Sequence, residues 1–167
     1  DGQILTFHSE KEFFAHFGLP YIPPAVRETG QELDRLNEIK ELVTIEDIKE
    51  GADFAHERGK KVFVTVNIIP HNEDFEGFED YLRDLESAGV DALIASDPGV
   101  IDLIKSTIPN MEIHLSTQAN TTNYRSANFW YKQGVKRVVV AREMSFKEIK
   151  EIRENIPKEM DIEAFMH

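Results

Sequence analysis

The chain has 167 residues and 41% hydrophobic residues, which suits one domain, or one domain with a small extension, built around an apolar core. Its 31 acidic and 19 basic residues give a formal net charge of −12, which argues against a basic nucleic-acid-binding face. The absence of cysteine excludes disulfides, thiolate nucleophiles and cysteine-held iron–sulfur clusters within this sequence. No apolar run is long enough to span a membrane and no signal-peptide pattern is visible, so we expect a cytoplasmic protein without membrane association.

Residues 1–48 differ in pattern from the rest of the chain. The stretch ILTFHS indicates a short strand, SEKEFFAHFG a short capped helix, and a proline-rich linker then leads into an acidic helix. We therefore expect a small, mainly helical N-terminal segment. The next helical pattern, which begins within VTIEDIK, lacks the preceding strand that a strand–helix–strand unit requires.

From Gly59 onward, apolar strand patterns alternate with amphipathic helix patterns. Gly59, Gly89 and Gly134 are each predicted to end a helix in the left-handed conformation, and Ile-Pro pairs stop the other two helices. Helices are predicted over the intervening stretches, which are 74–88, 97–107, 123–133 and 145–156. The predicted strands are 61–67, 91–96, 112–118, 136–142 and 161–166. This alternation favours an α/β fold, namely a partial (β/α) barrel of five parallel strands in sequential order with flanking helices.

Two predicted helices carry clear start signals. Asp97 followed by Pro98 is a cap with proline in the first turn, and Ser145 with Glu148 forms a capping box. In the second helix, Phe146, Ile149 and Ile152 are spaced to form one apolar face.

Polar residues gather where the predicted strands end, and ligands of parallel α/β folds bind at that edge. In the strand 112–118, alternation places His114, Ser116 and Gln118 on one face, which is unusual for a central strand unless it lines a site or a barrel interior. The other strand-end candidates are Asn67, Asp97, Arg142, Glu143 and His167.

Structural explanations compete with a functional one at each of these positions. Asn67 and Asp97 can simply meet water, and Asp97 can serve only as a helix cap. His114 can be a hydrogen-bonded core histidine. Arg142 and Glu143 fit either an anion clamp with a base or a surface salt bridge. No glycine-rich phosphate loop, nucleophile elbow or zinc motif is present, so we assign no catalytic residue and no metal site.

Several longer stretches of the chain resemble the collagenase-like peptidase family, peptidase family U32. They are GKKVFVTVNIIPHNED, GVDALIASDPGVI, EIHLSTQANTTN, VKRVVVAREMS and EAFMH, and they occur in order across the range from about residue 48 to residue 167. The resemblance implies a β/α barrel and either peptidase activity or iron–sulfur-dependent hydroxylation of tRNA, ribosomal RNA or ubiquinone. It also implies a pocket lined by Asn67, Ser116, Gln118, Arg142 and Glu143, with Asp97, His114, Glu163 and His167 as further candidates.

In this resemblance, Glu163 and Phe165 match the start of a family signature whose two cysteines would come after His167. The ligands of the family's cluster are therefore absent from this sequence, and we expect no cofactor held within this chain. The first two strands and the last strand of the family's barrel are also absent, so we expect a truncated and catalytically incomplete member.

Residues 1–49 resemble a different family, the bacterial X-family DNA polymerases, at the end of the thumb and the linker to their PHP domain. The carrying residues are SEKEFFAHFGLPYIPPAVRETGQEL and ELVTIEDIK, while the polymerase aspartates and the PHP metal histidines are missing. We therefore expect a chimera with domains 1–48 and 49–167. The alternatives are a structural fragment that self-associates through exposed sheet edges, giving a homo-oligomer, and a polymerase-derived nucleic-acid module, which the net charge disfavours.

Overall fold

The computed structural model describes residues 43–165, and it divides the chain into two compact units, residues 1–61 and 62–167. The predicted strand and helices of residues 1–42 lie outside the described residues. In the first unit, helix α3 (Ile45–His56) begins at a capping box in which Thr44 and Asp47 bond to each other's backbone N–H groups. Gly59, with φ of 65°, closes the helix end in the left-handed conformation that the sequence predicts.

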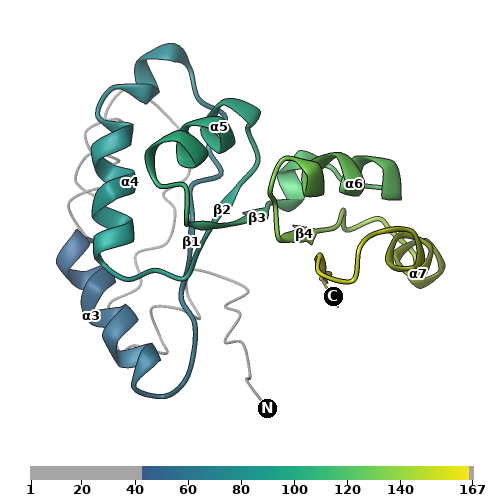
Figure 1. Ribbon diagram of the computed structural model, residues 1–167, viewed down its shortest axis with the longest axis horizontal. Coiled ribbons are helices and arrows are strands. Elements are labelled where there is room, and N and C mark those ends of the chain that lie inside the picture. The colour runs from purple at the N-terminus through teal and green to yellow at the C-terminus, as the bar shows by residue number, and fades with distance from the viewer. Residues whose placement is uncertain (1–42, 166–167) are drawn as a thin grey trace, which may run out of the picture. The chain divides into compact units, whose positions relative to one another are not determined.

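The second unit is built on a five-stranded parallel sheet, which confirms the predicted α/β class and strand order. Neighbouring strands follow each other in chain order from β1 to β5, and Figure 1 shows α5 (Pro98–Thr107) and α6 (Tyr124–Lys132) on the same side of them. The strands are β1 (Phe63–Thr65), β2 (Ala92–Ala95), β3 (Glu112–Leu115), β4 (Arg137–Val139) and β5 (Asp161–Glu163).

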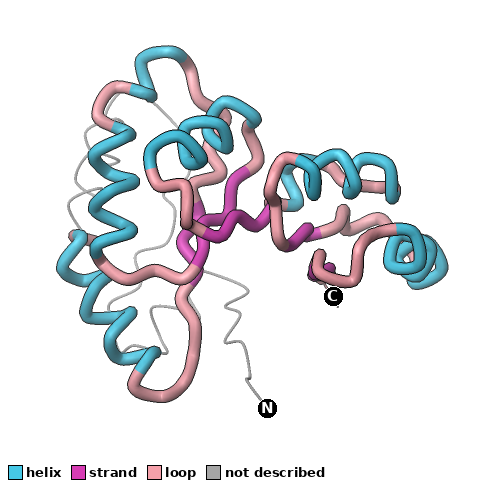
Figure 2. Tube along the Cα trace, in the orientation of Figure 1, coloured by secondary structure: helices cyan, strands magenta, loops and turns pink. Residues whose placement is uncertain are grey.

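Each strand is shorter than the sequence pattern predicts, and Figure 2 shows the strands as short segments between helices and loops. The predicted strand 112–118 stops at Leu115 because Ser116 caps a 3₁₀ helix, η2 (Thr117–Ala119). The apolar sequence pattern continues beyond the last hydrogen bond between neighbouring strands. Periodicity alone therefore does not show where a strand ends.

The helices between the strands lie close to their predicted positions. Gly77, with φ of 75°, splits the predicted helix 74–88, because its left-handed backbone cannot continue a right-handed helix. Phe146 was predicted to share one apolar helix face with Ile149 and Ile152, but it is 76% exposed, whereas Ile152 is 2% exposed. The elements are η1 (Asn72–Phe75), α4 (Phe78–Ser87), α5 (Pro98–Thr107), α6 (Tyr124–Lys132) and α7 (Phe146–Asn155).

The two faces of the sheet differ in chemistry. Residues paired in register on parallel strands point to the same face, so each strand contributes alternate side chains to each face. One face is apolar and buried, and it carries Leu93, Ala95, Ile113, Leu115 and Val138. The opposite face carries all five ionisable residues of the strands, which are Glu112, His114, Arg137, Asp161 and Glu163. The helices therefore have one apolar face to cover, and the other face is free for polar groups.

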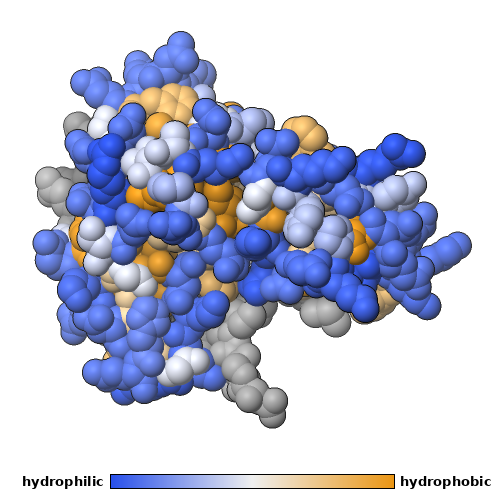
Figure 3. Space-filling view, viewed as in Figure 1, coloured by the Kyte–Doolittle hydropathy of each residue, from blue (hydrophilic) through white to orange (hydrophobic). Residues whose placement is uncertain are grey.

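The edges and the outer surface bear on association. Strands β1 and β5 each have one strand neighbour within the described residues, so the homo-oligomer expected through these edges stays a prediction. The face drawn in Figure 3 is dominated by hydrophilic residues, in keeping with the net charge of −12. Within residues 43–165, no helix is long and apolar enough to cross a membrane.

Candidate functional site

Four neutral polar side chains meet at the carboxyl ends of three neighbouring strands. Asn67 lies just beyond β1, Ser96 directly follows β2, and Ser116 directly follows β3. Gln118 lies on η2, the 3₁₀ helix that Ser116 caps. These four residues are called the strand-end cluster below. Because the three strands are parallel neighbours, the cluster occupies the edge of the sheet where α/β folds bind ligands.

Hydrogen bonds join the strand-end cluster across the strands. Asn67 Nδ2 and the backbone N–H of Gln118 both donate to Ser116 Oγ, each at 3.3 Å. The Ser96 hydroxyl lies 3.3 Å from the backbone carbonyl oxygen of Asn67 and 3.4 Å from Gln118 Oε1, so its one proton faces two acceptors. All of these distances exceed the usual value of about 2.7–3.0 Å. The bonds are therefore weak, and a ligand that both donates and accepts can replace them.

The strand-end cluster reaches from the protein interior to its surface. Ser96 and Ser116 are 9% and 4% exposed, whereas Asn67 is half-buried and Gln118 is exposed. Side-chain amides both donate and accept, so two amides above two buried hydroxyls suit a planar neutral group with alternating donors and acceptors. Of these four residues, the strand-end pattern pointed to Asn67, Ser116 and Gln118 and missed Ser96. The same rule applied to the end of GVDALIASD would have found it.

Three other predicted site residues near this edge have different surroundings. Asp97 Oδ1 accepts from the backbone N–H groups of Gly99 and Val100, at 2.8 and 3.0 Å, and thus caps α5. The guanidinium of Arg142 lies 4.1 Å from the centroid of the Phe165 ring, and Glu143 makes no ion pair with it among the described residues. Arg142 and Glu143 therefore do not form the surface salt bridge among the described residues, and an anion clamp with a base stays a prediction. His167 lies outside the described residues.

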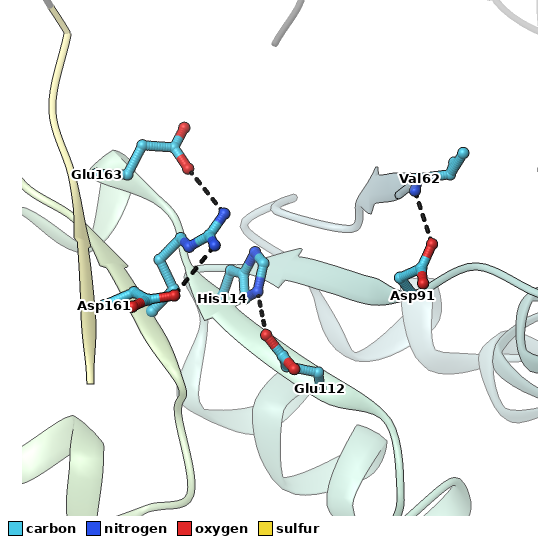
Figure 4. Close-up of polar contacts among 7 residues, drawn as sticks. Val62, Asp91, Glu112, His114, Asp161 and Glu163 are labelled. Carbon is cyan, nitrogen blue, oxygen red and sulfur yellow. Dashed lines mark hydrogen bonds and ion pairs between the residues drawn. The ribbon is translucent and has the colours of Figure 1, made fainter. Parts of the chain in front are cut away.

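His114 and Glu163 lie on the polar face of the sheet, where Figure 4 shows their polar contacts. No described hydrogen bond joins either residue to the strand-end cluster. Because β3 ends at Leu115, the alternation that placed His114 on one face with Ser116 and Gln118 does not continue. Glu163 Oε2 accepts from Arg137 at 3.4 Å, and Asp161 Oδ2 accepts from the same guanidinium at 3.1 Å. This guanidinium ties β4 to β5.

The His114 ring is held by one polar and one aromatic contact. Its Nε2 lies 2.8 Å from Glu112 Oε1, and its ring meets Phe63 edge-on with centroids 4.6 Å apart. Burial is the main effect that lowers the pKa of His114, the charge of Arg137 acts in the same direction, and the hydrogen bond with Glu112 opposes both. In the neutral ring, Nε2–H donates to Glu112, and Nδ1 has no hydrogen-bond partner among the described residues.

Comparison with known proteins identifies the family. The profile of peptidase family U32 matches residues 33–167, which is more than half of the chain. The chain belongs to peptidase family U32. The match begins at residue 33, inside the segment predicted to derive from an X-family polymerase, and the polymerase resemblance has no support from the comparisons. The domain boundary at residues 48 and 49 stays a prediction.

Several curated relatives of this U32 chain are named for RNA hydroxylation. It is 45% identical over 124 residues to tRNA hydroxylation protein P1 of Bacillus subtilis, covering 74% of this chain and 29% of the relative. It is 46% identical over 122 residues to tRNA hydroxylation protein P of Escherichia coli, covering 73% and 27%. A 23S rRNA 5-hydroxycytidine synthase of E. coli is 37% identical over 124 residues, covering 74% and 18%. The chain thus spans less than a third of the length of these relatives.

A solved structure supports the fold. The U32 peptidase Mk0906 superimposes with a TM-score of 0.58 and 16% identity, covering 71% of this chain and 50% of Mk0906. An iron–sulfur cluster, which the family resemblance implies, does not fit the residues of this chain. Such clusters are held by cysteine thiolates, and none of the 167 residues is a cysteine. Among the described residues, no group of three or more His, Asp or Glu side chains could hold a metal ion.

Proposed function

We propose that this U32 chain is part of an RNA hydroxylation protein and that the strand-end cluster binds the edge of the pyrimidine base to be hydroxylated. The observation that carries the proposal is the convergence of two amides and two hydroxyls at the carboxyl ends of β1, β2 and β3. Asparagine and glutamine amides match the donor and acceptor pattern of a base edge, and the cluster contains no charge that would favour a phosphate. The names of the relatives, which include tRNA and ribosomal RNA, support the same class of substrate.

In this proposal the chain binds and orients the base without completing the reaction. Hydroxyl and amide side chains can hold a pyrimidine in place, but none of the four is a redox group. The family's cluster would supply electron-transfer chemistry, and this chain contributes no thiolate for it. We therefore expect base binding without turnover by the 167-residue chain.

Binding of free nucleosides tests the proposal directly. In NMR titrations, uridine or cytidine should shift the signals of Asn67 and Gln118, and Gln118→Ala should weaken binding by about tenfold as a hydrogen-bonded partner is lost. Ser106→Ala is a matched control, since that hydroxyl bonds only to carbonyls of its own helix α5, at 3.0 Å. Shifts confined to other parts of the chain, or an equal effect of both substitutions, would contradict the proposal.

Turnover is tested in cells. The chain would be produced in a bacterial strain that lacks its own tRNA hydroxylation proteins, and the tRNA nucleosides would then be analysed by mass spectrometry. We expect no gain of an oxygen atom in the pyrimidines. A restored hydroxylated nucleoside would show that the chain alone is catalytically complete.

A further inference from the structure

Two arginines near the carboxyl end of the sheet have no carboxylate partner among the described residues. They are Arg125 and Arg142, and both are exposed. Two other arginines are neutralised by carboxylates: Arg83 pairs with Glu79 and Asp80 at 3.0 and 2.8 Å, and Arg137 pairs with two carboxylates of β5. The half-buried Arg153 donates to backbone carbonyls. In a chain with 31 acidic and 19 basic residues, two exposed arginines without an acidic partner stand apart from this pattern.

Each of these arginines lies over an aromatic ring instead. The guanidinium carbon of Arg142 is 4.1 Å from the centroid of Phe165, and that of Arg125 is 5.9 Å from the centroid of Tyr124. A contact with a ring engages the flat face of the guanidinium and leaves its N–H groups at the edge available. The side chain is thereby oriented while its donors remain available for an acceptor, and a phosphate is the acceptor that this fork of donors fits best.

The two arginines lie on neighbouring segments beside the strand-end cluster. Arg142 lies just beyond β4, and Arg125 lies in the first turn of α6, which follows η2. The backbone N–H of Ala141 donates to the carbonyl of Thr121 at 3.2 Å and holds the two segments together. Gln118 lies three residues before Thr121 in the sequence. The strand-end cluster, Arg125 and Arg142 therefore all lie on segments that follow the carboxyl ends of neighbouring strands, from β1 to β4.

We propose that Arg142 on Phe165 and Arg125 on Tyr124 bind the phosphates of a single-stranded RNA whose target base lies at the strand-end cluster. This inference rests on the proposed function and adds the partner's backbone to it. Single-stranded nucleic acids are held by cations that follow the phosphates and by aromatic rings that meet the bases, and both groups are present here. The net charge of −12 argued against a nucleic-acid partner. That charge is a sum over the whole chain, in which carboxylates already neutralise Arg83 and Arg137 but not Arg125 or Arg142. Binding should therefore be local and steeply weakened by salt.

Fluorescence anisotropy with a short, labelled, uridine-rich RNA tests this proposal on the 167-residue chain. Arg142→Ala and Arg125→Ala should each weaken binding by about tenfold, the loss of one charge-assisted contact. Each should also reduce the dependence of log K on log salt concentration by about 0.7, the value for one phosphate of a single strand. Arg83→Ala makes the same change of charge on α4, where two carboxylates already neutralise the guanidinium, and it should leave both values unchanged.

Two further variants separate the parts of the proposal. Arg142→Lys keeps the charge but loses the planar fork, so it should recover only part of the affinity. Glu143→Gln removes the neighbouring negative charge and should strengthen binding. Circular dichroism melts would confirm that each variant is folded. Absence of RNA binding by the parent chain at low salt, or an equal loss with Arg83→Ala, would overturn the proposal. If the parent chain bound no free nucleoside but its RNA binding still depended on Arg125 and Arg142, only the proposed function would be refuted.

Discussion

Lowering the pH should destabilise the protein through His114. The ring is 1% exposed, and its pKa lies below the ordinary value of 6.5 because burial and the charge of Arg137 outweigh the opposing effects of the Glu112 and Glu163 carboxylates. Between the folded pKa and 6.5, the unfolded chain binds a proton that the folded chain does not. The stability linked to His114 is therefore fully present above pH 6.5 and declines as the pH falls from there toward the folded pKa.

The expected change in the free energy of unfolding follows from the binding of one proton. A difference of one bound proton changes the free energy of unfolding by at most about 1.4 kcal/mol per pH unit. With a urea dependence of about 2 kcal/mol per molar, the midpoint of unfolding would fall by at most about 0.7 M for each pH unit. Trp130 on α6 is the single tryptophan of the chain, so its fluorescence reports unfolding of the second unit.

Two substitutions isolate the effect of His114 from the other titrating groups. His114→Gln removes the imidazole, so its midpoint should depend less on pH than that of the parent chain between about pH 5 and 7. Glu112→Gln removes the partner that stabilises the charged ring, so the loss of stability on acidification should become larger. Equal pH dependence of the parent and His114→Gln would refute the reasoning. A parent that gains stability relative to His114→Gln on acidification would show that Glu112 outweighs burial.

Two further predictions concern the sheet. Arg137→Met should lower the free energy of unfolding by about 1–2 kcal/mol, because a guanidinium only 12% exposed no longer ties β4 to β5, while Arg83→Ala, at 51% exposure, should cost less than about 1 kcal/mol. Urea titrations measure both, and equal costs would contradict the importance of burial for this pair. Edge strands β1 and β5 should also support self-association, so light scattering should give a mass above the 19.2 kDa of one chain that falls on dilution. A constant mass of one chain at all concentrations would count against it.

The strand and helix pattern was predictable because it follows from local rules. Gly59, Gly89 and Gly134 all have positive φ, as their positions between helix and strand predict. The capping box of Ser145 with Glu148 forms as predicted, and the Asp97 cap also appears. Each of these signals depends on a few neighbouring residues, so the sequence displays it directly. The exposure of Phe146 was missed because a helical face shows which residues align but not how far the neighbouring elements extend.

The candidate site was predictable only in part. The rule that ligands bind where parallel strands end pointed to Asn67, Ser116 and Gln118, but the contacts among them depend on where each strand stops. The placement of Arg142 over Phe165 joins residues 23 positions apart across two strand ends, and no local pattern indicates it. The pairing of Arg137 with Asp161 and Glu163 likewise appears only once β4 and β5 lie side by side.

By itself, the sequence determined the class of the fold, the order of its elements and the family of the chain. Hydrophobic periodicity, glycines that end helices and family-specific sequence motifs are all properties of residues that are neighbours in the chain. The tertiary structure decided the chemistry of the two sheet faces and which side chains surround each polar group. His114 shows the difference: its pattern allowed either a core histidine or a ligand-binding one, and the packing of Phe63 and Glu112 around it sets its burial and its proton affinity. Parallel strands bring distant residues into register, so only the assembled sheet fixes which charges meet.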